Sequence, residues 1–107
     1  MPSYLVQVSY TSAAMAALVK KPHDRSKVVE KAVEKLGGRV KSAWLCFGDY
    51  DTIVLVEMPD SVSAAAFALA VSAGGSCKAV KTTPLLSVDE GVAAMKKASG
   101  SGYRPVS

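Results

Sequence analysis

The pattern of apolar and polar side chains in residues 4–10 is typical of a β-strand. Every second position is aromatic or β-branched: Tyr4, Val6, Val8 and Tyr10. This period of two predicts a strand with one face more apolar than the other. Two longer apolar runs, 40–47 and 52–58, are joined by a short Gly/Asp-rich connection and predict a hairpin. Residues 77–83 predict a fourth strand.

Helical spacing or helix-forming composition marks the segments between these strands and one segment after them. The segments are 13–20, a restart at Asp24 or Ser26 after a break at Pro22, 61–73 and 87–98. Ser87 and Glu90 stand three residues apart as in a capping box, so the last helix is predicted to begin there. The tail 99–107 contains Gly, Ser and Pro and little to bury, and we expect it to be frayed or docked on a partner.

The order of these elements predicts a ferredoxin-like α+β sandwich (βαββαβ) with an extra C-terminal helix, a single domain over residues 1–98. Right-handed crossovers predict an antiparallel sheet with strand order 4-1-3-2, with its two central strands, the first and third, parallel to each other. Both helices then cover one face of the sheet and leave the other face bare.

The bare face is predicted to be an interface. If Tyr4, Val6 and Val8 face the helices, then Leu5 points the other way, and on the third strand Ile53 and Leu55 do the same. Three such residues make a patch that a soluble monomer seldom exposes. We therefore expect the face to pack on another sheet, most simply in a homodimer with two-fold symmetry.

Composition supports a globular domain and excludes several classes of protein. Half of the 107 residues are apolar and about a fifth are charged, which excludes a disordered chain. The longest charge-free apolar stretch, 61–77, is broken by Ser and Gly and is too short for a membrane span, so no membrane association is expected. The start of the chain lacks the layout of a secretory signal, which predicts a cytoplasmic location. The two cysteines, Cys46 and Cys77, fall on opposite edge strands roughly 14 Å apart and are expected to be free thiols.

The basic residues do not predict nucleic-acid binding. The net charge is +4, and Lys27, Lys31 and Lys35 form one helical stripe interleaved with Glu30 and Glu34. This spacing is typical of a solvated helix face with intrahelical ion pairs. No exposed aromatic platform accompanies it, so nucleic acid is not an expected partner.

Several motifs resemble those of the GYD (glycine-tyrosine-aspartate) domain family. They are WLCFGDYD at 44–51, TIVLVEMPD at 52–60, YLVQVSYT at 4–11 and VKTTPLL at 80–86. Here Asp49 stands between the glycine and the tyrosine of the motif. The resemblance spans residues 1–98 and implies the dimeric α/β-barrel superfamily, in which two ferredoxin-like sheets face each other. Related barrels include cofactor-free monooxygenases, isomerases, haem-binding enzymes and ligand-sensing regulatory domains. A shared fold does not indicate which of these functions a given member has.

The loop 48–51 is the first candidate site. Tyr50 and Asp51 could present a hydroxyl and a carboxylate to a ligand, but a structural turn accounts for the same residue types. Asp49 and Asp51 do not make a recognisable metal-ligand set with one distant histidine, so no metal is expected. That histidine, His23, follows Pro22 in a polar break without a companion and is interpreted as a solvated loop residue.

The second candidate site lies at the margin of the bare face. Gln7, Ser9, Trp44 and Glu57 are the ligand-binding candidates, around an apolar wall that fits a small apolar ligand. On the second strand either Trp44 and Cys46 or Leu45 and Phe47 face inward. Glu57 beside this wall would have a raised pKa and could act as a base, or it could simply reach water or a lysine. The alternative for the whole cluster is interface packing without a pocket.

Two functions follow from these candidates. The first is small-molecule binding in a pocket at the sheet face or dimer interface, or between the sheet and the helices. In this first function Glu57, Tyr50 or Asp51 would carry the catalysis of a cofactor-independent enzyme. The alternative is a non-enzymatic ligand-sensing or assembly module with a filled interface. Neither function requires a cofactor.

The helix predicted at 61–73 suggests a further contact because it carries no charge on any face. A helix that is apolar all round is usually buried all round. This predicts that its outer side contacts a further subunit, giving a higher oligomer, or the chain's own C-terminal segment. We place Ala68 on that outer side. The alternative is an exposed alanine face that needs no partner.

Overall fold

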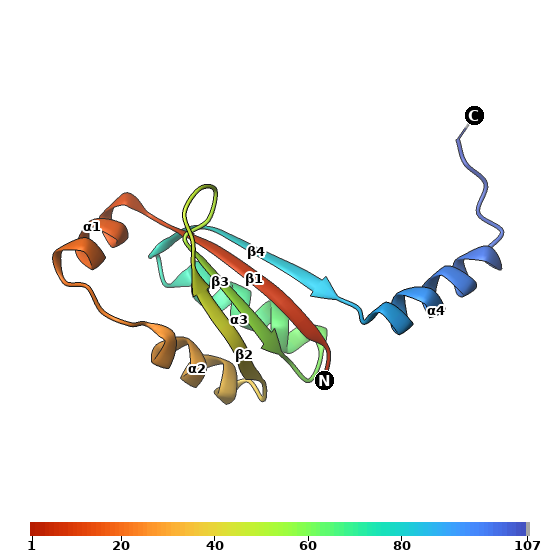
Figure 1. Cartoon of the computed structure of the whole chain (residues 1–107), viewed down its shortest axis with the longest axis horizontal. Helices are drawn as coiled ribbons and strands as arrows, with labels where there is room; N and C mark the ends of the chain where they lie inside the picture. Colours follow the sequence, from red (N-terminus) through yellow and green to blue (C-terminus); the bar gives the residue numbers. More distant parts are fainter. Residues whose placement is uncertain (107) are drawn as a thin grey trace.

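The computed structural model describes residues 1–106 and contains a four-stranded sheet with four helices (Figure 1). The strands are β1 (Ser3–Tyr10), β2 (Arg39–Leu45), β3 (Thr52–Glu57) and β4 (Cys77–Leu85). The helices are α1 (Ser12–Lys20), α2 (Ser26–Lys35), α3 (Ser61–Ala73) and α4 (Val88–Ser99). The elements predicted from the sequence are confirmed, including the division of the helical region before β2 into α1 and α2 at the predicted break. Ser107, the last residue of the predicted tail, lies outside the described residues.

The sheet has the order β2-β3-β1-β4, which is the predicted order 4-1-3-2 read from the other edge. All three neighbouring pairs are antiparallel, including the central pair β1 and β3. The expectation of a parallel central pair was wrong. A right-handed crossover makes β2 parallel to β1, and the hairpin then reverses the chain, so β3 must run against β1.

The core lies between one face of the sheet and the helices α2 and α3. Its buried residues are Tyr4, Val6 and Val8 of β1, Val54 and Val56 of β3, Met58, Val33 of α2, and Ala64 and Phe67 of α3. These strand residues are the ones that the period-two pattern assigned to the helix side. Gly38 makes this packing possible between α2 and β2, since a Cβ there would overlap the Glu57 carbonyl oxygen and the Met58 sulfur.

The side of α3 that faces the sheet is not the one that we expected. Ala64 and Phe67 are buried against the sheet and Ala68 is half-buried, whereas Val62 and Leu69 are exposed. Ala68 therefore lies toward the sheet and not on the outer side, because it is one helical turn from the buried Ala64. The outer side instead presents the larger side chains Val62 and Leu69.

Two helices extend away from the body of the molecule. The helices α1 and α4 contain no buried residue, and α4 projects beyond the end of β4 (Figure 1). The radius of gyration is 16.9 Å, with principal extents of 56 × 35 × 22 Å. A compact chain of this length would have a radius of gyration of about 13 Å. Among the described helices, none is long and apolar enough to cross a membrane.

Candidate functional site

The uncovered face of the sheet carries the cluster predicted from the sequence. The strand register places Lys81, Gln7, Ile53 and Trp44 in one row across the four strands, and Thr83, Leu5, Leu55 and Ser42 in the next. Trp44 therefore shares this face with Ile53, and Leu45 belongs to the opposite face. Leu5, Ile53 and Leu55 are only half-buried in the single chain.

Glu57 ends the same face but is held by an ion pair. The Arg39 Nε–H donates to the Glu57 carboxylate at 2.5 Å, across the β2–β3 register that sets these two residues opposite each other. This hydrogen bond lowers the pKa of Glu57 below its ordinary value and outweighs the opposing effect of desolvation. The expected raised pKa was wrong, because the guanidinium stabilises the charged carboxylate. Glu57 is therefore a poor general base.

The loop between β2 and β3 is tied to β1 by hydrogen bonds from both its backbone and the Asp51 side chain. The Ser9 hydroxyl donates to the Asp49 carbonyl oxygen at 2.5 Å, and the Asp51 carboxylate accepts the Tyr10 amide N–H at 2.8 Å. The Cys46 thiol donates to the Tyr50 carbonyl oxygen at 3.2 Å. These bonds are those of a structural turn, the alternative that the sequence left open. Ser9 is 2% exposed, so its hydroxyl faces the loop instead of a ligand.

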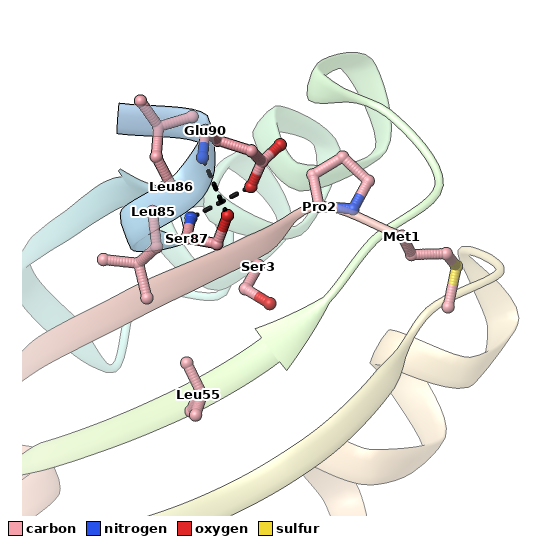
Figure 2. Close-up of a pocket in the computed structure, with 8 residues that line it drawn as sticks. All are labelled: Met1, Pro2, Ser3, Leu55, Leu85, Leu86, Ser87 and Glu90. Atoms are coloured by element: carbon pink, nitrogen blue, oxygen red, sulfur yellow. Dashed lines mark hydrogen bonds between the residues drawn. The ribbon is translucent and has the colours of Figure 1, made fainter. Parts of the chain in front are cut away.

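A shallow cavity of about 590 Å³ lies where the uncovered face meets the start of α4 (Figure 2). Met1, Pro2, Leu55, Leu85 and Leu86 provide its apolar wall. Ser3 contributes a hydroxyl, and the other polar side chains are engaged in the capping box, in which the Glu90 carboxylate accepts the Ser87 amide N–H and the Ser87 hydroxyl accepts the Glu90 amide N–H (Figure 2). This cavity therefore has few free polar groups with which to orient a ligand.

A larger cavity of about 870 Å³ lies on the helix side, between α1, α2 and the ends of β2 and β3. Its apolar wall comprises Met15, Leu18, Val19, Pro22, Val29, Val40, Ala43, Leu45 and Val54. The Tyr10 hydroxyl lies in hydrogen-bonding range of the Thr52 hydroxyl, at 3.2 Å, on its floor. A mostly apolar wall with a few polar groups is the usual composition of a small-molecule site.

The end of the connection between α1 and α2, with the first residue of α2, supplies one group of polar side chains to this cavity: His23, Asp24, Arg25 and Ser26. Tyr10, Asp51 and Thr52 supply the other group. His23 Nδ1 lies 2.9 Å from the Lys21 carbonyl oxygen, and Asp24 accepts the Ser26 amide N–H at 2.8 Å. That bond lowers the pKa of Asp24. His23 is exposed, as expected of a loop histidine, but it contributes to a cavity wall that the sequence did not reveal.

Neither cysteine pairing nor a metal cluster contributes to these sites. Cys46 follows the edge strand β2 and Cys77 begins the other edge strand, and both are free as predicted. Burial raises the pKa of the Cys77 thiol. Within residues 1–106, no three His, Cys, Asp or Glu side chains converge in a way that could hold a metal ion.

Three solved structures share this fold at low sequence identity. FFRP-DM1 is 19% identical with a TM-score of 0.51, over 80% of this chain and 100% of its own. The hypothetical protein PHS023 from Pyrococcus horikoshii is 16% identical with a TM-score of 0.52, over 81% of this chain and 92% of its own. MtbAldR is 15% identical with a TM-score of 0.57, over 80% of this chain and 52% of its own.

Comparison at the level of sequence gives the family. No curated protein matches the chain. The model of the GYD domain, however, matches residues 4–95, which include all of the sheet except Ser3, the loop 48–51 and most of α4. The chain therefore belongs to the GYD domain family.

Proposed function

We propose that this protein is a small-molecule-binding module without chemistry of its own, and that its ligand occupies the helix-side cavity. The observation that carries the proposal is the composition of that cavity, which has a mostly apolar wall and two groups of polar side chains, one at residues 23–26 and one at Tyr10, Asp51 and Thr52. Such a site suits a small molecule with a mostly apolar body and one or two hydrogen-bonding groups at the end near His23 and Arg25.

The contacts made by the three catalytic candidates favour a binding function over a catalytic one. Glu57 is ion-paired with Arg39 at its strand's end, and the Asp51 carboxylate accepts the Tyr10 amide N–H. Tyr50 belongs to a loop whose bonds to β1 and Cys46 are those of a turn. A general base needs a pKa near the working pH, and the lowered pKa of Glu57 moves it in the wrong direction.

The experiment measures binding of 1-anilinonaphthalene-8-sulfonate, an apolar probe with one charged group. Ala43→Trp places an indole in the cavity from β2, and Ala70→Trp places the same side chain on the exposed side of α3 as the matched control. We expect Ala43→Trp to weaken binding at least tenfold and Ala70→Trp to leave it unchanged. Equal binding by both variants would overturn the proposal.

The amide chemical shifts locate the probe. Addition of the probe should shift the NMR signals of Leu18, Val29 and Ala43, which line the cavity. Shifts confined to Leu5 and Leu55 would instead assign the binding site to the uncovered face of the sheet.

A second role, assembly, is favoured by that uncovered face. Its apolar side chains Leu5, Ile53 and Leu55 are adjacent in the register and are not covered by α2 or α3. We propose that this face packs against the same face of a second copy, because one patch can complement itself across a two-fold axis. The two roles are compatible, since the cavity and the uncovered face lie on opposite sides of the sheet.

A further inference from the structure

The helix α4 has an apolar stripe that no part of its own chain covers. Val88, Val92 and Met95 are spaced i, i+4 and i+7, so they lie on one side of the helix, and all three are exposed. Val88 is the first residue of the helix, next to the body of the molecule, and is nevertheless 84% exposed. The stripe therefore faces away from the chain's own sheet, on a helix that projects beyond the end of β4 (Figure 1).

A glycine on the same side of α4 has no packing role within the chain. Gly91 comes three residues after Val88 and four before Met95, so it lies on the side of the stripe. A Cβ at Gly91 would meet no atom of the rest of the chain within 4 Å. Glycine in the interior of a helix is destabilising relative to alanine, but it lets another backbone approach closely. Gly91 therefore favours a close backbone neighbour over this stripe.

We propose that α4 pairs antiparallel with α4 of a second copy, across a two-fold axis that passes beside Val92. An isologous contact of this kind needs one surface that complements itself. Val88 and Met95 lie four and three residues from Val92 on either side, so each comes close to the other in the opposite helix. The paired stripes then cover each other along about 18 Å, the length of a helix of 12 residues.

The charges beside the stripe are complementary across this axis. Asp89 follows Val88 by one position and Lys96 follows Met95 by one position, so both charges lie on the same flank of the stripe. A two-fold axis perpendicular to both helices sets this flank of one helix against the same flank of the other. Asp89 and Lys96 lie about 4.5 Å and 6 Å from Val92 along the helix, so each is within about 1.5 Å of the level of its opposite charge.

A parallel pair of helices would lack this complementarity. It would set the charged flank against the other flank of the stripe, where Gly91, Ala94 and Ala98 carry no charge. The remaining charged residues of α4, Glu90 and Lys97, lie on the side opposite the stripe, and the Glu90 carboxylate is held in the capping box. The charge pattern therefore selects the antiparallel arrangement.

The contact is small, which sets the conditions under which it forms. Two helices paired over this length bury less than the about 1,200 Å² of a stable interface of standard size. Single chains therefore pair weakly through α4 at micromolar concentration, and the pairing joins chains at higher concentration. It involves neither the ligand cavity nor the uncovered face of the sheet, so its test is independent of the proposed function.

The test uses the full chain with one added cysteine close to the two-fold axis. Val92→Cys places a thiol on the stripe, and Ala93→Cys, the matched control, places one on the opposite side of α4. Each variant is equilibrated at submillimolar concentration in a glutathione redox buffer, and mass mapping without reduction identifies the linked peptides.

We expect a disulfide that joins position 92 of two chains, at least fivefold more abundant than the link through position 93. This bond requires the two Cα atoms to come within about 7 Å, a close approach that Gly91 permits. Equal yields from the two positions, no link through position 92, or linkage of position 92 mainly to Cys46 or Cys77 would each overturn the proposal.

An exchange of charges tests the antiparallel direction. Added to the Val92→Cys chain, Asp89→Lys and Lys96→Asp each set like charges opposite each other and should each lower the yield of the link about threefold to tenfold. The two variants mixed together should link to each other at the parental yield, because the lysines of one chain meet the aspartates of the other. Lys97→Asp, on the opposite side of α4, is the control and should leave the yield unchanged. A mixture that links no better than either variant alone would overturn the antiparallel pairing.

Discussion

Glu57 and Arg39 form an ion pair whose contribution to the stability of the protein should depend on pH in the acidic range. Arg39 lowers the pKa of Glu57 in the folded state, so below its ordinary value of 4.5 the unfolded chain binds the proton more readily than the folded chain does. The stabilisation by this pair is therefore fully present above pH 4.5 and is lost as the pH falls through the lowered pKa of the folded state.

We expect Glu57→Gln to reduce this pH dependence. Urea unfolding of the parent and the variant at pH 7, 5 and 3 measures the effect: the variant should be the less stable protein at pH 7, and the difference should shrink toward pH 3. Glu34→Gln, at an exposed position on α2, is the control. A stability difference that stays constant over this pH range would show that the pair does not act through titration of Glu57.

Single residues also show the limit of inference from sequence. Alternation in β1 correctly assigned Tyr4, Val6 and Val8 to the core, because the side-chain direction in a strand depends only on local geometry. The pKa of Glu57 could not be predicted in the same way. It depends on Arg39, which is 18 positions away in sequence and becomes its neighbour only through the β2–β3 register.

At the scale of elements, α3 makes a prediction about its outer side. Val62 and Leu69 are exposed there, with Leu69 at 69%, and we expect them to contact a further subunit beyond the dimer. Leu69→Glu should then reduce the assembly to a dimer by sedimentation equilibrium, because a charge would be buried in that contact. Val28→Glu, an exposed valine on α2, is the control. An unchanged mass for Leu69→Glu would mean that the outer side of α3 faces water.

The rotation of α3 about its own axis shows which properties of a helix can be predicted from its sequence. An uncharged helix was predicted correctly, but with small residues on every side its rotation could not be read from an apolar stripe. The single large aromatic residue, Phe67, sets the rotation by packing into the core, and Ala68 follows it inward. Ala68→Glu would therefore test the stability of the fold and not the assembly.

A pocket between the sheet and the helices was one of the expected locations, but the residues that line it could not be predicted, for a related reason. Its wall combines Met15 and Leu18 of α1, Val29 of α2 and Leu45 of β2, which belong to three elements. The break at Pro22 was visible in the sequence, but the path of the chain between the two helices was not. That path, and not the composition of either helix, leaves space between α1 and the sheet.

At the scale of the whole molecule, the extended shape and the uncovered sheet face lead to a prediction about association. A radius of gyration of 16.9 Å, against about 13 Å for a compact chain of this length, means that much of the surface is remote from the chain's own core. The apolar residues Leu5, Ile53 and Leu55 add a contiguous patch that water would cover at a cost of about 25 cal/mol per Å². We therefore expect this face to form a dimer, of twice the 11.1 kDa of one chain, as the smallest species at micromolar concentration.

Leu55→Asp tests the face through which this dimer forms. Leu55 lies directly opposite Leu5 in the register, so an aspartate there would place an unpaired charge between the two sheets. We expect the variant to sediment as a monomer while keeping the far-UV circular dichroism of the parent, because the side chain points away from the core. Val28→Asp adds the same charge on the exposed side of α2 and should leave the dimer intact. If Leu55→Asp remains a dimer, the association does not depend on the sheet face.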